Sequence, residues 1–531
     1  MFGANLKKDL SASLVVFLVA LPLCIGISMS SGGTPIQGIM AGVIGGIVVG
    51  VFSGSNVSVS GPAAGLISIV AVAFGDLEKA HQGQAFEYFA MALLLAGLIQ
   101  IALGALKAGF IGDFIPVSVI KGMLAAIGII LILKEIPHIL GYDHDLEGEM
   151  EFNQADGHNT FSEILYSIKQ VYPLAILIGA IGLIIQRVWE LPIIKQKSWS
   201  QVIPPALLTV VLGVLINGIA PMEGFFSKIT DIEHMVSVPV LSSDGNIFDS
   251  FIGLSKEFHL PNFNGIYDFK VWYYAFLIAI IASIESLLSL EAGDKIDPLK
   301  RTSPTNKELV AQGIGNTLSG LIGAMPITAV IVRTSANVNS GAKTKWSAIF
   351  HGIWLMLFVI LAPGLMNLIP KSALAAILIF VGYKLAKPSL FTDQFKSGWN
   401  NFIPFVTTVI AIVLSNLLMG VLIGLFFGYY FILKSNYHKA FTIVKYQNSF
   451  LLRFHNQITF LNKSVLKSHF LKMNSGENLI LDFSNCTFID SDIIDVINDF
   501  QIHAAYEKIH IEYKFQYVGQ LEKLQLKPNQ I

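Results

Sequence analysis

The chain has 531 residues, of which 53% are hydrophobic and 13% are charged. Soluble domains carry about 25% charged residues, so this composition, with a mean hydropathy of +0.63, indicates a protein whose solvent is largely lipid. The 35 Lys and Arg nearly balance the 36 Asp and Glu, which leaves no basic field for binding nucleic acid. Two cysteines are too few for a disulfide framework or a cysteine-rich metal site.

The apolar pattern predicts an all-α polytopic membrane protein with fourteen spans in two sets of seven. The first set lies at about 10–30, 36–52, 60–74, 89–106, 117–133, 165–185 and 203–219. The second set lies at about 273–290, 309–324, 327–338, 348–368, 373–385, 405–418 and 421–433. We therefore expect a transmembrane domain at 1–436, with repeat one at about 9–220 and repeat two at about 271–436.

The distribution of charge predicts the orientation of these spans. The run after Lys7 and Lys8 lacks a small-residue cleavage site, so it is interpreted as the first span. With a cytoplasmic N-terminus, the connections expected inside are basic, and they contain Arg187, Lys195, Lys197, Lys295, Lys300, Arg301, Lys307, Lys343, Lys345, Lys387 and Lys396. The connection 138–162 has no Lys or Arg but six carboxylates, as expected outside. The positive-inside rule thus predicts a multi-pass protein of the plasma (inner) membrane with both termini cytoplasmic.

The third and tenth spans are short, and Gly and Pro introduce each of them, at 59–65 and 323–329. Pro62 lies 52 residues after the first apolar onset at Leu10, and Pro326 lies 53 after the second at Tyr273. This spacing is typical of an inverted repeat containing two broken helices, whose N-termini point at a site near the membrane midplane. Free N–H groups there favour a small anion. The alternative is that Gly-Pro only kinks two ordinary membrane helices.

Two charged residues lie inside predicted spans. Arg333, in the tenth span, is a guanidinium that offers charge and forked donors to an oxyanion; its alternative role is to pair with a buried carboxylate. Glu285, in the eighth span, lies one helical turn from Ser289. The Glu285 carboxylate is expected either to carry a proton or, with the Ser289 hydroxyl, to hold Na⁺, or else to pack as a silent partner of Arg333.

Three segments make the chain resemble the SulP anion-transporter family, the bacterial relatives of animal sulfate, chloride and bicarbonate carriers and of prestin. They are 56–65 (NVSVSGPAAG), 308–344 (ELVAQGIGNTLSGLIGAMPITAVIVRTSANVNSGAKT) and the C-terminal region. The resemblance implies a seven-plus-seven inverted repeat like that of uracil permease. A core domain would hold the anion between helices 3 and 10 and move as an elevator against a gate domain. It also implies a homodimer.

The same resemblance assigns roles to individual residues. The substrate cradle would consist of Ala63, Ala64, Gly65, Ile327, Thr328, Ala329 and Arg333. Glu285 and Ser289 match the position of the coupling ion, which is Na⁺ or H⁺; no other cofactor or metal is expected. The segment 20–26 (ALPLCIG) is similar to that of sodium-bicarbonate members, although these typically have Asp and Thr at the coupling position. Bicarbonate is therefore favoured over sulfate, and the coupling ion stays open.

The composition becomes that of a soluble domain from about Tyr446, after a linker at 437–445. Residues 478–483 read as a buried strand, followed by a turn and a helix from Ser491. The tail resembles a small α/β STAS domain, because Asp482, Ser484, Asp490 and Ser491 match the signature of that family. Asp490-Ser491 is predicted to cap the helix; in related bacterial antagonists the matching Ser is phosphorylated, so Ser491 is a candidate regulatory site.

Several functions other than coupled bicarbonate transport are compatible with the sequence. Sulfate or dicarboxylate symport with H⁺, an anion channel or exchanger, a nucleobase permease and a membrane-tethered scaffold all fit the architecture. Glu285 favours coupled transport over a channel, since a passive pore needs no titratable group. An enzyme is not expected, because the sequence has no His cluster, phosphate-binding loop or nucleophile elbow.

Overall fold

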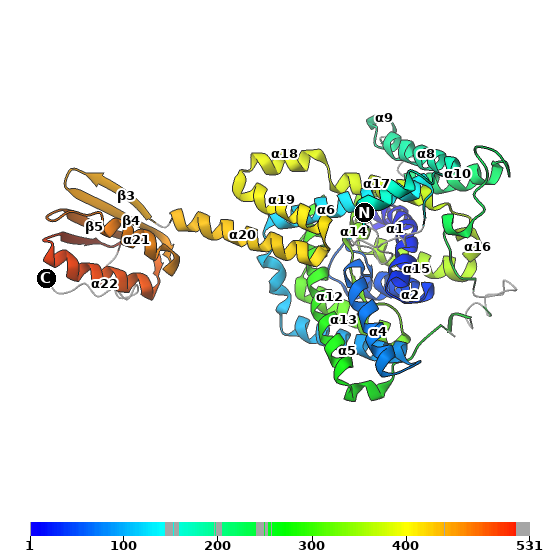
Figure 1. Cartoon of the computed structure of the whole chain (residues 1–531), viewed down its shortest axis with the longest axis horizontal. Coiled ribbons are helices and arrows are strands. Elements are labelled where there is room, and N and C mark those ends of the chain that lie inside the picture. Colours follow the sequence, from blue (N-terminus) through cyan, green and yellow to red (C-terminus); the bar gives the residue numbers. More distant parts are fainter. Residues whose placement is uncertain are drawn as a thin grey trace. The chain divides into compact units, whose positions relative to one another are not determined.

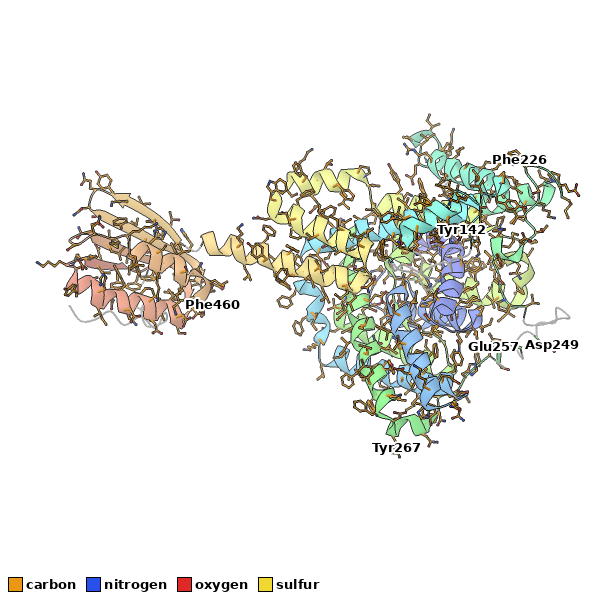
Figure 2. All side chains as sticks on the ribbon, in the orientation of Figure 1. Tyr142, Phe226, Asp249, Glu257, Tyr267 and Phe460 are labelled. Carbon is orange, nitrogen blue, oxygen red and sulfur yellow. The ribbon has the colours of Figure 1, made fainter. Side chains whose placement is uncertain are left out.

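The computed structural model describes residues 2–143, 152, 159–195, 197, 204–240, 249, 253–255, 257–439 and 441–516. The chain divides into two compact units, residues 1–426 and 427–531, and the boundary falls within the helix α20 (Leu417–Lys439). The first unit is helical, and its side chains fill the space between the helices (Figure 2). The second unit contains a β-sheet with helices (Figure 1).

The first half of the helical unit follows the predicted order of spans. Its α-helices and its first strand are α1 (Phe2–Ser30), α2 (Pro35–Ile44), α3 (Gly50–Phe52), β1 (Ser60–Pro62), α4 (Ile67–Ala80), α5 (Ala85–Ala105), α6 (Val117–Leu140), α7 (Thr160–Ser167), α8 (Pro173–Trp189), α9 (Pro192–Lys195) and α10 (Pro205–Ile219). Short π or 3₁₀ turns are η1 (Gly45–Val49), η2 (Ala64–Leu66), η3 (Ala108–Phe114) and η4 (Ile232–His234).

The second half repeats this pattern after η5 (Phe263–Tyr267). Its elements are α12 (Phe269–Ile296), α13 (Thr305–Ile322), β2 (Ile327–Ala329), α14 (Ile331–Asn339), α15 (Trp346–Leu361), α16 (Pro363–Met366), α17 (Lys371–Leu385), α18 (Pro388–Lys396), α19 (Trp399–Leu414) and α20 (Leu417–Lys439). In the described part of the chain, seven helices are long and apolar enough to cross a membrane, and four shorter apolar helices accompany them. The three remaining predicted spans correspond to α4, α13 and α14.

Equivalent helices of the two halves make equivalent contacts. The helix α12 packs on α5, and its counterpart α1 packs on α15. Likewise α6 contacts α19, and α17 contacts α8. Figure 1 shows α5, α12 and α13 side by side in the helical unit. These paired contacts are what an inverted repeat produces.

The prediction of helix at the start of the third and tenth spans was wrong. Residues 60–62 and 327–329 form the strands β1 and β2, which pair antiparallel with Gly61 opposite Thr328. Proline lacks the N–H of a helix interior and disfavours helical backbone in the residue before it. Pro62 and Pro326 therefore delay each helix, so that α4 begins at Ile67 and α14 at Ile331.

Prolines also divide two of the other predicted spans. The span predicted at 165–185 is interrupted after Ser167, and α8 restarts with Pro173 in its first turn. The span predicted at 348–368 is divided where α15 ends at Leu361 and Pro363 opens α16. A proline is tolerated in a first helical turn, where its missing N–H would have no helical partner.

The second unit is a four-stranded sheet in the order β3 (Phe441–Tyr446), β4 (Ser449–Ile458), β5 (Asn478–Ile489) and β6 (His510–Lys514). The β3–β4 pair is antiparallel, and β4–β5 and β5–β6 are parallel. The helices are α21 (Lys463–Phe470) and α22 (Ser491–Tyr506), with a 3₁₀ turn η6 (Phe460–Asn462). The strand predicted at 478–483 and the helix predicted from Ser491 are both confirmed.

The predicted linker at 437–445 contains regular structure. The helix α20 runs to Lys439 and β3 starts at Phe441. Phe441 and Ile443 alternate with exposed residues and pack on the core of the sheet, which gives the period of two expected of a strand that is half-buried.

Candidate functional site

Each of the two paired strands, β1 and β2, leads into the start of a helix. After β1, Ala63 precedes the turn η2 and α4; after β2, Val330 precedes α14. Neither Ala63 nor Val330 has a side-chain acceptor that could cap a helix. The first N–H groups of an α-helix have no partner within the helix, so the start of α14 presents free donors and the positive end of a helix dipole. At η2 the dipole has the same direction, but the N–H of Gly65 donates to Glu285 and that of Leu66 to the carbonyl of Ala63.

A cavity of about 40 Å³ adjoins both helix starts. Five of the residues predicted for the site line it: Ala64, Gly65, Glu285, Ser289 and Arg333. Apolar side chains such as Leu23 and Ile127 complete its wall. The sequence positions of these residues span both halves of the chain, as expected for a site between two repeats.

The remaining predicted residues lie beside this cavity and do not line it. Ala63 precedes η2 and is buried. Ile327, Thr328 and Ala329 form β2 and are completely buried. The N–H of Ala329 donates to Ser286 Oγ at 3.2 Å, and that of Ile327 donates to Asn316 Oδ1 at 2.7 Å. These main-chain donors fix the strand, whereas the free donors belong to the helix that follows it.

Glu285 lies against the start of the first short helix. Its carboxylate accepts a hydrogen bond from the backbone N–H of Gly65. A Cβ on residue 65 would lie 3.0 Å from Glu285 Oε2, so a larger residue there would displace the carboxylate by a few tenths of an ångström. That oxygen is buried and has no hydrogen-bond partner among the described residues. An acceptor of this kind needs a proton or a cation, because a buried carboxylate oxygen without a partner is costly.

Arg333 is completely buried. Its Nη2 donates to Cys24 Sγ at 3.3 Å, while Nε and Nη1 have no partner in the described part of the chain. The guanidinium lies against Gly61, where an added Cβ would come within 1.8 Å of Nη1. No ion pair joins Arg333 to Glu285 among the described residues, so the pairing considered as the alternative role of both is absent.

A buried polar row on α13 holds the two strands, and the sequence interpretation missed it. Gln312 Nε2 donates to Ser60 Oγ at 2.7 Å and to Glu308 Oε1 at 2.8 Å. Asn316 Nδ2 donates to the carbonyl of Ile327 at 2.9 Å. Glu308, Gln312 and Asn316 recur at intervals of four on a helix with apolar neighbours. Polar residues repeated every four positions lie on one face of a helix, and this pattern in the sequence would have identified them.

A second missed cluster lies near the end of α6. Asp143 Oδ1 contacts His138 Nδ1 at 2.5 Å, and Asp143 Oδ2 contacts His234 Nδ1 at 2.6 Å. Burial raises the pKa of Asp143, but its hydrogen bonds to the two histidines outweigh burial and lower that pKa to about 2. Asp143 is the only carboxylate of the acidic connection in its described part; Asp145, Glu147, Glu149, Glu151 and Asp156 lie outside the described residues.

In the second unit, Asp490 caps α22. Its side chain accepts from the N–H of Asp492 at 3.1 Å, so the predicted helix cap is confirmed. Ser491 is the first residue of that helix and is exposed. Its Oγ lies 3.4 Å from Asp490 Oδ1.

Comparisons with known proteins agree with this architecture. The family model described as the sulfate permease family matches residues 6–411. The putative sulfate transporter YvdB of Bacillus subtilis is 27% identical over 435 residues, covering 81% of this chain and 75% of its own length. The bicarbonate transporter BicA of Picosynechococcus sp. is 25% identical over 420 residues, covering 78% and 68%.

Two solved structures share the fold. The transmembrane domain of a cyanobacterial bicarbonate transporter, BicA, aligns with a TM-score of 0.54 at 23% identity, covering 80% of this chain and 97% of that domain. The structure of SLC26A9 aligns with a TM-score of 0.66 at 15% identity, covering 97% of this chain and 85% of that one.

Proposed function

This chain belongs to the sulfate permease family, and we propose that it is a secondary active transporter of small inorganic oxyanions. Bicarbonate, coupled to Na⁺ or H⁺, is the favoured substrate, ahead of sulfate. Similar proteins named as sulfate and as bicarbonate transporters support inorganic anion transport as a class. The resemblance of residues 20–26 to sodium-bicarbonate members supports the order of preference.

The single observation that carries the proposal is the cavity that adjoins two helix starts beside a buried arginine. Each start is worth on the order of 0.3–1 kcal/mol to an anion, and Arg333 adds a full positive charge with two unpartnered donor nitrogens. The cavity has room for a small ion. In this proposal the main-chain donors at the start of α14 hold the oxyanion, the dipoles of both helix starts favour it, and Arg333, which lies against Gly61, adds its positive charge.

Glu285 and Ser289 supply the proposed coupling site. Both line the cavity, on the same face of α12. The unpartnered Oε2 of Glu285 fits either a proton or a sodium ion, and the Ser289 hydroxyl is an oxygen ligand of the kind that Na⁺ accepts. A cation next to the bound anion would offset its charge, which links the movement of the two ions.

The wider arrangement follows from the same proposal. Paired contacts between the two halves support a seven-plus-seven repeat in which a core domain moves as an elevator against a gate domain. The charge pattern supports cytoplasmic termini and a plasma-membrane location. The mixed sheet of the second unit supports a STAS domain at 446–531, through which a homodimer would form. Exposure of Ser491 keeps it available for phosphorylation.

The test is uptake into proteoliposomes that contain the purified full-length chain. Labelled bicarbonate and labelled sulfate are offered under an inward Na⁺ gradient, an inward H⁺ gradient, or neither. The proposal expects gradient-dependent uptake of bicarbonate that unlabelled sulfate inhibits weakly. Preferential H⁺-dependent uptake of sulfate would make sulfate the substrate, and rapid gradient-independent flux would indicate a channel. A scaffold predicts no flux of either anion.

A further inference from the structure

A second, larger cavity lies in the helical unit, at the other end of the helices that line the proposed site. Its volume is about 390 Å³, about ten times the 40 Å³ of the first cavity. The helices α1 and α14 line both cavities, the small one through Leu23 and Arg333, the large one through Lys8 and Asn339. The remaining walls come from α8, the start of α10 and α17.

Three lysines and one glutamate line this cavity: Lys8, Lys343, Lys384 and Glu190. Three positive charges and one negative charge leave a net charge of +2. Lys384 Nζ pairs with Glu190 Oε1 at 2.6 Å. The ammonium groups of Lys8 and Lys343 have no hydrogen-bond or ion-pair partner among the described residues, so they are available to an anion.

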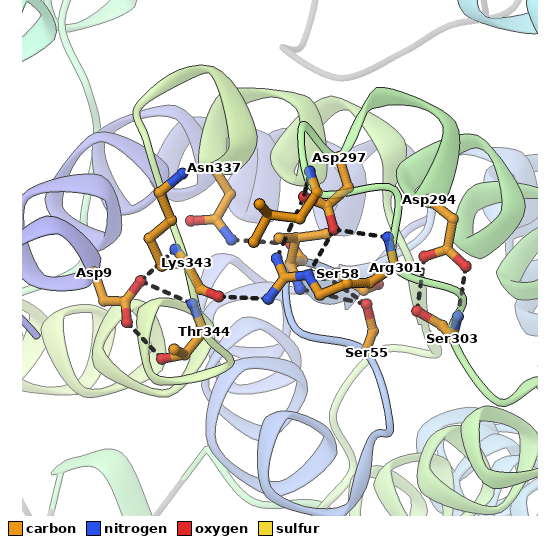
Figure 3. A network of polar contacts seen from close by, with 12 residues as sticks. Asp9, Ser55, Ser58, Asp294, Asp297, Arg301, Ser303, Asn337, Lys343 and Thr344 are labelled. Carbon is orange, nitrogen blue, oxygen red and sulfur yellow. Dashed lines mark hydrogen bonds and ion pairs between the residues drawn. The ribbon is translucent and has the colours of Figure 1, made fainter. Parts of the chain in front are cut away.

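The backbone at Lys343 is fixed on both sides (Figure 3). Its N–H donates to Asp9 Oδ1 at 2.6 Å, and its carbonyl accepts from Arg301 Nη1 at 2.7 Å. Asp9 is buried and also accepts from the N–H of Thr344 at 3.0 Å. Because Asp9 directly follows Lys8, these bonds hold the two available lysines at one cavity. Pre-organisation of this kind lowers the entropy lost when a ligand binds.

Aromatic side chains form another part of the wall. Trp189 and Phe380 both line the cavity, and Lys384 Nζ lies 4.7 Å from the centre of the Phe380 ring. A volume of 390 Å³ falls in the range of about 300–1,000 Å³ that is typical of sites for organic ligands. A small inorganic anion needs neither this volume nor aromatic walls.

We propose that this cavity binds a phosphate ester with an organic body, its phosphate on Lys8 and Lys343 and its body against Trp189 and Phe380. Lysine is a common phosphate ligand, and aromatic faces pack against planar or apolar groups. The ester is either a soluble nucleotide-like metabolite or the headgroup of an anionic phospholipid. By the charge rule used above, the cavity opens to the cytoplasm.

Such a ligand would act on transport, and this step rests on the proposed function. It would contact α1 and α14, which carry the proposed anion site, and also α8 and α17. A ligand that contacts α1 and α14 on one side and α8 and α17 on the other opposes movement of the first pair against the second. We therefore expect the phosphate ester to inhibit uptake from the cytoplasmic face.

Binding is measured first, on the full-length protein in nanodiscs of phosphatidylcholine, with AMP as the probe. The test variant is Lys8→Gln with Lys343→Gln. The matched control is Lys7→Gln with Lys387→Gln, which removes two exposed lysines that do not line the cavity. We expect AMP to bind the parent and the control alike, and the test variant at least tenfold more weakly. Inorganic phosphate should compete with AMP, but only at higher concentration.

Nanodiscs that contain phosphatidic acid distinguish the two sources of phosphate. If the parent binds AMP more weakly in these discs, the lipid headgroup occupies the site. If AMP binding is unchanged, the ligand of the site is the soluble ester. The proposal is overturned if neither AMP nor phosphatidic acid binds, if the test variant binds as the parent does, or if phosphate or sulfate competes as well as AMP. AMP inside proteoliposomes should also slow uptake; binding without inhibition refutes the bridging role. Since binding needs no flux, its outcome is independent of the proposed transport function.

Discussion

The carboxylate of Glu285 accepts a hydrogen bond from the backbone N–H of Gly65. This bond joins the middle of α12 to the first turn after β1. The two residues are 220 positions apart and belong to opposite halves of the chain. Any change in the charge of Glu285 therefore acts directly on one of the two helix starts that face the cavity. In the proposed transporter this contact is the physical link between the coupling ion and the anion.

Gly65→Ala is expected to reduce coupled uptake at least tenfold. The new Cβ would lie 3.0 Å from Glu285 Oε2, so the carboxylate must shift by a few tenths of an ångström and its hydrogen bond to the N–H of residue 65 is strained. Gly75→Ala is the matched control on α4, because no described heavy atom lies within 4 Å of that added Cβ. Initial uptake rates, normalised to the amount of folded protein, decide the comparison. Equal rates for the two variants would contradict the close contact.

Arg333→Gln is expected to raise the KM for the anion at least tenfold, because it removes the positive charge beside the cavity. Arg333→Lys should retain part of the affinity, since it keeps the charge and loses the forked donors. Substrate dependence of uptake gives KM, and thermal unfolding of each variant serves as the control for folding. An unchanged KM in Arg333→Gln would show that the charge does not act on the substrate.

The Asp143 cluster predicts a dependence of stability on pH. The hydrogen bond to Asp143 raises the pKa of His234 against the effect of burial, with Asp231 raising it further and Lys371 lowering it. The stabilisation from His234 is thus complete below the pKa of about 6.5 in the unfolded chain and is lost as pH rises through the raised value. The lowered pKa of Asp143 preserves its contribution above about pH 4 and loses it toward pH 2.

Stability should accordingly be greater at pH 6 than at pH 8.5. We expect the unfolding temperature to fall by on the order of 2 °C between these values. Asp143→Asn should lower it at pH 6 and reduce the pH dependence. Thermal unfolding of both proteins in one detergent provides the comparison, and an equal slope in the variant would exclude the cluster as its source.

Asp490→Ala is expected to loosen the first turn of α22. Loss of a side-chain cap costs about 1 kcal/mol, and the N–H of Asp492 would lose its acceptor. Amide hydrogen exchange of the full-length chain should become faster in the first turn of α22 and remain unchanged in β3 and β4. Faster exchange throughout the sheet would show a structural role beyond the cap.

The sequence predicted the order of the elements well, because apolar length and periodicity decide where a chain crosses lipid. Proline and glycine predicted the interruptions at Pro62 and Pro326, but not the strands β1 and β2. Strand pairing between residues 60–62 and 327–329 depends on two segments far apart in the chain, and no local pattern reports it.

For a similar reason, the sequence predicted the charged residues of the candidate site but not the residues that contact them. A charge within an apolar span identified Arg333 and Glu285, and both line the cavity. Their partners were not predictable. Cys24 is an ordinary apolar neighbour in the sequence, and its contact with Arg333 at 3.3 Å arises only when α1 packs on α14. Gly65 was placed in the cradle, but its bond to Glu285 requires the folded geometry.

The most direct test of the account is the effect of Glu285→Gln on bicarbonate uptake under imposed Na⁺ or H⁺ gradients. The matched control is Glu291→Gln on the same helix, whose carboxylate pairs with Lys295 at 3.1 Å and does not line the small cavity. The account predicts that the parent and Glu291→Gln accumulate bicarbonate when one gradient is applied and that Glu285→Gln does not. Gradient-driven accumulation by Glu285→Gln equal to that of the parent would contradict it.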